Sequence, residues 1–137
     1  MKNTLILLGC ALFAMVPVCA EKAETPLGRE MENLAGAFKA FAKETDSAKG
    51  AALAREAQQA ALKGMAELPA MLKEMPAGPE KDKAGAAFRK KMGQVFVAFC
   101  EAEEAFLAGK PEEVAKIVTA LKDLKKEGHK AFVKDED

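Results

Sequence analysis

Two side chains that can bind a transition metal stand in distant parts of the chain. His129 is the single histidine among 137 residues, and Met31 lies in the first quarter of the sequence. Imidazole nitrogen and thioether sulfur are both ligands of iron. The ordinary alternatives are that the methionine fills space in an apolar core and that the histidine faces solvent near a helix end. Which applies depends on the elements that carry the two residues.

The first twenty residues form a separate unit. Residues 5–18 are mostly apolar, and small residues at 18–20 suit cleavage by a signal peptidase. The apolar stretch is too short to span a bilayer comfortably. We therefore expect a cleavable signal peptide at residues 1–20 and one exported domain at residues 21–137, which places the mature protein in the periplasm. The alternative is a lipoprotein, because residues 7–10 resemble a lipobox placed unusually early.

Charge and cysteine content narrow the functions of the mature chain. Without Lys2 the chain holds 20 basic and 21 acidic residues, a net charge of about −1 with both signs interspersed. This charge distribution does not indicate binding to nucleic acid or stable association with a membrane. Cys100 is the one cysteine left after cleavage, so no intramolecular disulfide can form. We expect a monomer in which Cys100 is a packed or half-exposed small residue.

Apolar residues recur with helical spacing in four segments, and the composition, rich in alanine, lysine, glutamate and leucine, favours helices. The first segment starts at Pro26 and the second at about Ala48, after a cap at Asp46 or Ser47. Pro69 is expected to end or kink the second segment. The third segment covers about 81–107, and the fourth runs from Pro111 to about 132. The first carries one continuous apolar stripe, which consists of Leu27, Met31, Leu34, Phe38 and Phe41.

The short connections predict an all-α fold, an antiparallel up-down-up-down four-helix bundle. In that arrangement the first helix begins at the same end of the bundle at which the fourth helix ends. Met31 and His129 then lie at similar depth on two inward faces. At about 100° per residue, His129 stands about 20° from Val118 around the helix axis, so we expect it to face the core or its edge.

An imidazole and a thioether that face each other across an apolar cavity suit the iron of a haem. Two protein ligands leave no open coordination position, which favours electron transfer over catalysis and indicates that the protein is not an enzyme. The chain has no Cys-x-x-Cys-His motif, so the haem would be held without covalent attachment. Lys125 or Lys134 could pair with the haem propionates.

Two segments carry a resemblance to a known family. One is Leu-Gly-Arg-Glu-Met-Glu-Asn-Leu at residues 27–34, and the other extends from Leu121-Lys122 through Gly-His-Lys-Ala-Phe at residues 128–132. Phe88-Arg89 and the Ala-Gly-Lys at residues 108–110 fall in register between them. With these residues the mature chain resembles the cytochrome b562 family, periplasmic four-helix bundles that bind haem b.

The resemblance implies a set of haem contacts. Met31 and His129 would be the axial ligands of one non-covalent haem b per chain, with Phe88 and Met92 flanking the haem. Met92 stands where the family has an aromatic residue, and Lys125 stands where it has an arginine near the haem edge. These two departures bear on haem affinity and on redox potential.

Three functions remain open at the level of sequence. The leading hypothesis is a periplasmic electron carrier that exchanges electrons with redox partner proteins of unknown identity. The second is a haem-free helical-bundle adaptor or stress-related binding protein. The third is a protein that holds or senses haem, in which electron flow is incidental. A visible spectrum of the purified protein separates the first hypothesis from the second.

Overall fold

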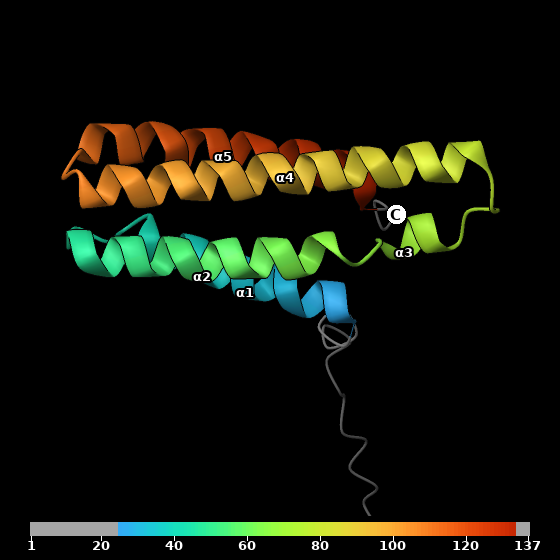
Figure 1. Ribbon diagram of the computed structural model, residues 1–137, viewed down its shortest axis with the longest axis horizontal. Helices are drawn as coiled ribbons and strands as arrows, with labels where there is room; N and C mark the ends of the chain where they lie inside the picture. The colour runs from blue at the N-terminus through green and yellow to red at the C-terminus, as the bar shows by residue number, and fades with distance from the viewer. Residues whose placement is uncertain (1–24, 134–137) are drawn as a thin grey trace, which may run out of the picture.

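The computed structural model describes residues 25–133, and within that range every regular element is an α-helix. The helices are α1 (Pro26–Phe41), α2 (Ser47–Met65), α3 (Ala70–Lys73), α4 (Pro79–Leu107) and α5 (Pro111–Phe132), as Figure 1 shows. Four long helices are consistent with the predicted four-helix bundle. The signal peptide predicted at residues 1–20 lies outside the described residues. Between residues 25 and 133, no helix combines the length and the apolarity needed to cross a membrane.

The residues at the N-termini of the helices are of types that favour a helix start. The Thr25 hydroxyl accepts a hydrogen bond from the Gly28 N–H at 2.9 Å, and the Asp46 carboxylate accepts one from the Lys49 N–H at 2.8 Å. These caps satisfy N–H groups that have no partner inside the helix. Asp46, and not Ser47, is therefore the cap of α2. Helices α1, α4 and α5 each begin with proline, whose missing N–H costs nothing at the first helical position.

Helix α2 ends shortly before Pro69, in agreement with the expectation that this proline ends or kinks the segment. It stops at Met65, and a separate one-turn helix, α3, follows Pro69. Proline lacks the N–H that a continuing helix would need, so Pro69 ends α2 and does not merely kink it. Leu72, which follows Pro69, is buried on α3 with 2% exposure.

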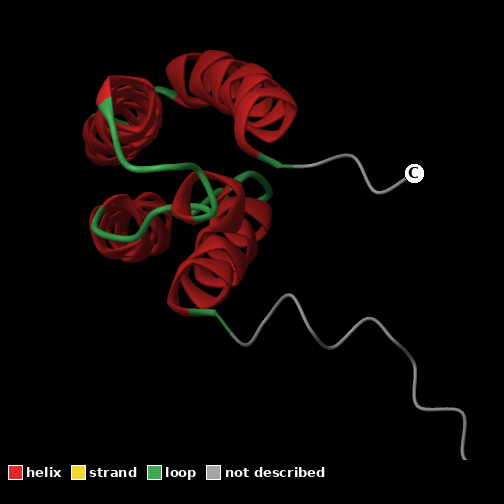
Figure 2. Ribbon diagram, turned by 90° about the vertical axis from the view of Figure 1, so that its right-hand side faces the viewer, coloured by secondary structure: helices red, strands yellow, loops and turns green. Residues whose placement is uncertain are grey.

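The long helices pack in the order α1 on α2, α2 on α4, and α4 on α5, and Figure 2 shows them end-on. Within residues 25–133, α1 and α5 are not among the closely packed pairs. The buried face of α2 consists of glycine and alanine alone: Gly50, Ala51, Ala54, Ala57, Ala60, Ala61 and Gly64. Small side chains let the α2 backbone approach α1 and α4 closely, so α2 joins α1 to the rest of the bundle.

One end of the bundle is filled by phenylalanine. This end carries the α1–α2 and α4–α5 connections (Figure 1). Phe41 is fully buried, and its ring lies edge-on to the rings of Phe38, Phe99 and Phe106 at centroid distances of 5.4, 5.5 and 6.0 Å. We call the opposite end, where α1 begins, α3 lies and α5 ends, the α3 end. Because aromatic packing closes the first end, the α3 end is where a ligand site can lie.

Candidate functional site

Met31 points from α1 toward α2 and α4 at the α3 end. A Cβ atom built on Gly64 of α2 would lie 2.9 Å from the Met31 Cε and 3.2 Å from the Met92 Cε. The same position is 3.6 Å from a Leu27 methyl group. The two methionine side chains therefore meet over the bare backbone of Gly64. Met31 is half-buried and Met92 is 6% exposed, so both belong to the apolar interior of this end.

Phe88 and Phe132 connect α4 with the last turn of α5. Their rings lie edge-on with centroids 5.4 Å apart and an interplanar angle of 82°. Phe88 is 5% exposed and precedes Met92 by four residues, which places both on one face of α4. A continuous apolar cluster thus runs from Met31 on α1, through Met92 and Phe88 on α4, to Phe132 on α5. We call it the α3-end cluster.

His129 lies in the last turn of α5, three residues before Phe132, and its side chain is exposed. The expectation that it faces the core is therefore wrong, whereas a position at the edge of the core holds, because Val118, about 20° away around the helix axis, is partly buried against the core. The buried residues of α5 are Val114 and Leu121, and Phe132 packs in line with Val114. At about 100° per residue, His129 stands about 60° from Val114 and farther from Leu121. It lies beside the stripe that α4 covers, and among the helices of residues 25–133 the one that packs closely on α5 is α4.

Lys125 is exposed and lies one turn before His129 on α5. A nearby ion pair joins this part of α5 to α4, with the Lys91 Nζ 2.7 Å from a Glu127 carboxylate oxygen. The hydrogen bond from Lys91 lowers the pKa of Glu127 below its usual range. The aliphatic stem of Lys91 also passes Gly128, whose Cβ position would be 3.8 Å from the Lys91 Cγ. These contacts hold the turn that carries His129 against α4.

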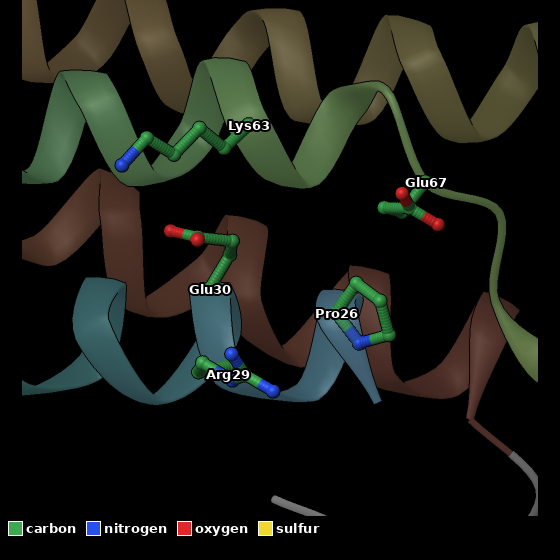
Figure 3. A pocket seen from close by; sticks show the side chains of 5 residues that line it. All are labelled: Pro26, Arg29, Glu30, Lys63 and Glu67. Carbon is green, nitrogen blue, oxygen red and sulfur yellow. The ribbon is translucent and has the colours of Figure 1, made fainter. Parts of the chain in front are cut away.

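A small hollow lies between the start of α1 and the end of α2 (Figure 3). It measures about 200 Å³ and is lined by Pro26, Arg29, Glu30, Lys63 and Glu67. Ligand pockets in proteins usually measure roughly 300–1,000 Å³ and have mostly apolar walls. The hollow is smaller and is lined mainly by charged side chains, so it is not a site for a large apolar cofactor.

Cys100 is half-buried on α4, as expected. Burial, followed by the nearby carboxylates of Glu103, Glu104 and Glu101, raises the pKa of the Cys100 thiol. A thiol with a raised pKa is a poor nucleophile and a poor metal ligand at neutral pH. Within residues 25–133, no group of three or more His, Cys, Asp or Glu side chains could hold a metal ion.

Gly64 is the residue of this site that sequence reasoning missed. It is the third of three small residues at seven-residue spacing on α2, after Gly50 and Ala57. Residues at that spacing lie on one face of a helix, and a glycine on that face can indicate a point at which a neighbouring helix or side chain closely approaches the backbone. The pattern alone does not reveal that two methionine side chains meet at Gly64, since they come from α1 and α4.

The candidate donors at this end are of the types that can bind a haem iron. The sulfur of Met31 and the imidazole of His129 stand on different helices, and thioether with imidazole is an axial pair found in cytochromes. The α3-end cluster supplies apolar surface for the porphyrin faces. Helices α1 and α5, which carry the two donors, are not pressed together as the other neighbouring helices are.

A helical bundle with an apolar cluster and two candidate iron ligands at one end is the arrangement expected of a haem-binding bundle. A sequence model of the cytochrome b562 family matches residues 26–132, which is all but the first and last of the described residues. The chain therefore belongs to the cytochrome b562 family. Membership suggests a haem-binding electron-transfer protein, and such carriers are generally not enzymes. No curated protein matches the chain.

Proposed function

We propose that the mature protein binds one non-covalent haem b in the periplasm, with Met31 and His129 as axial ligands, and carries single electrons. The observation that supports this proposal is the α3-end cluster. It places the Met31 side chain over Gly64 and joins α4 to the last turn of α5 through Phe88 and Phe132. The residue expected to provide sulfur and the turn expected to provide nitrogen thus belong to one apolar assembly.

Each residue has a distinct role in this proposal. The haem, when bound, supplies the one-electron chemistry of its iron. Met31 provides the soft sulfur ligand, which favours ferrous iron and raises the potential. Phe88 and Met92 exclude water from the porphyrin, and Lys125 offers a positive charge for a propionate; Lys134, the other candidate, lies outside the described residues. The exposed ring of His129 needs no displacement from a core to reach an entering ligand.

The proposal extends to processing and topology. Residues 1–20 are removed on export, and the four long helices follow the antiparallel up-down-up-down order that their short connections favour. Intact mass of the protein from a periplasmic extract tests the first point, with a mass for residues 21–137 expected. A full-length mass, or a mass increased by a lipid on Cys10, would contradict it.

The proposed protein is a monomer. Size-exclusion chromatography with light scattering tests this expectation.

Hemin titration followed by visible spectroscopy tests ligation. The wild-type protein should give a low-spin spectrum with sharp α and β bands after reduction. His129→Ala should weaken haem binding most, because nitrogen is the stronger ligand, and Met31→Ala should leave haem bound with a weakened low-spin signature. Met75→Ala, which removes a half-buried methionine after α3, is the matched control and should behave as wild type.

Thermal melting provides an independent readout. A ligand that binds the native state alone stabilises it by about 2.7 kcal/mol when its free concentration is 100 times the dissociation constant. Saturating hemin should therefore raise the melting temperature of wild type and raise that of His129→Ala much less. A protein that stays colourless with hemin and melts at the same temperature would instead support the haem-free adaptor.

A further inference from the structure

We propose that Gly64 is a positioning residue for the sulfur ligand. The bare backbone of α2 at Gly64, which we call the seat, leaves the space in which the end of the Met31 side chain points inward. This inference rests on the proposed function, since it assigns a role within the same site. Gly64 itself touches no iron. It acts through Met31, and through Met92 on the other side of the seat.

The space at the seat is filled by the methyl groups of Met31 and Met92. A single added methyl group at Gly64 would approach the Met31 Cε at 2.9 Å and the Met92 Cε at 3.2 Å. Carbon atoms in good van der Waals contact are about 3.5–4.0 Å apart, so neither side chain could stay where it is. Both contacts involve the far end of a flexible side chain, which can move without unfolding the helix. The side chain that moves first is that of Met31, because its contact is shorter and it is less buried than Met92.

Backbone geometry does not explain the glycine. Among the described glycines, positive φ angles occur at Gly78 and Gly109. Gly64 instead lies in the last turn of α2 with helical geometry, where alanine is the more favourable residue. Gly64 is also buried, so its lack of a side chain is a matter of space. The space is the volume that the two methionine methyl groups occupy.

Gly64→Ala tests the role, with Gly36→Ala as the matched control. Gly36 is also a helical glycine, but a Cβ there would meet nothing within 4 Å. In Gly64→Ala the haem should remain bound through His129, lose the sulfur-to-iron charge-transfer band, and dissociate roughly 10–100-fold more readily, the usual range for residues that orient a metal ligand. Gly36→Ala should match wild type in both measurements. In a Met31→Ala background, Gly64→Ala should change haem affinity clearly less than it does in wild type, because the Met31 side chain is gone and Met92 is the one methionine that the new methyl group still displaces.

A second measurement needs no haem. In protein labelled with ¹³C at the methionine methyl groups, the Met31 and Met92 methyls should each show a nuclear Overhauser effect to the Gly64 α-protons. Absence of the Met31–Gly64 contact in the wild-type protein would overturn the inference, whatever the variant does. Equal or tighter haem binding by Gly64→Ala would also overturn it, because the seat would then not favour ligation. Failure of wild type to bind haem would refute the proposed function, while the NMR contact would still report on the seat.

Discussion

Gly50→Ala tests how closely α2 packs against α4. Gly50 is buried on α2, and a Cβ atom there would lie 2.6 Å from the Phe106 Cγ and closer still to Cδ1 and Cε1. Restoring a contact of about 3.5 Å requires the ring to move by about 0.9 Å or more. The ring has little freedom, because Phe106 is 5% exposed and packs against the fully buried Phe41.

The expected energy follows from two opposing effects. Overpacking a core costs about 1–3 kcal/mol, and the immobile ring argues for the upper end. Replacing a helical glycine by alanine returns up to about 1 kcal/mol. Gly50→Ala should therefore lower the free energy of unfolding by about 2 kcal/mol. Gly36→Ala, with open space around its Cβ position, should raise it by about 0.5–1 kcal/mol.

Urea unfolding followed by circular dichroism at 222 nm measures both variants, and equal slopes would show that the midpoints can be compared. Adding Phe106→Leu should cost less in the Gly50→Ala protein than in wild type, because the smaller side chain relieves the clash. If Gly50→Ala proved as stable as Gly36→Ala, or if the two changes were strictly additive, the close approach of α2 to Phe106 would not exist.

Three further predictions concern single polar groups. Hydrogen bonds from Gln58 and then Arg55, at 2.7 and 2.6 Å, lower the pKa of Glu103 below its ordinary value of 4.5. This stabilisation is complete above the unfolded-state pKa and is lost as pH falls through the folded-state pKa. Glu103→Gln should thus cost about 1 kcal/mol in urea unfolding at pH 7 and progressively less in acid; an equal cost at every pH would contradict this. The Cys100 thiol, with its raised pKa, should react with iodoacetamide more slowly than free cysteine at pH 7.5, and rapid labelling of the folded protein would contradict its burial. Asp46→Ala should lower the melting temperature through loss of about 1 kcal/mol of capping, whereas an unchanged value would mean that the cap is dispensable.

Local sequence determined the helices of this protein. Pro26 and Pro111 begin helices because proline fits the first turn, and Pro69 ends one because it lacks the N–H needed in a helix interior. The apolar spacing through Met31 placed its side chain on the inner face of α1, and the structure confirms this by its contact at Gly64. Such features depend on residues within about one helical turn of each other, so they can be inferred without knowledge of the packing.

Only the tertiary structure decided which helices touch and what they cover. His129 is exposed at the edge of the stripe that α4 covers, although Val118, about 20° from it around the axis of α5, is partly buried, and helical periodicity alone could not separate the two. The seat at Gly64 requires α1 and α4 to reach α2 at the same level. The bond between Gln58 and Glu103 likewise joins side chains 45 residues apart. Contacts of this kind depend on the rotation and depth of whole helices, which are set jointly by all the side chains at their interfaces.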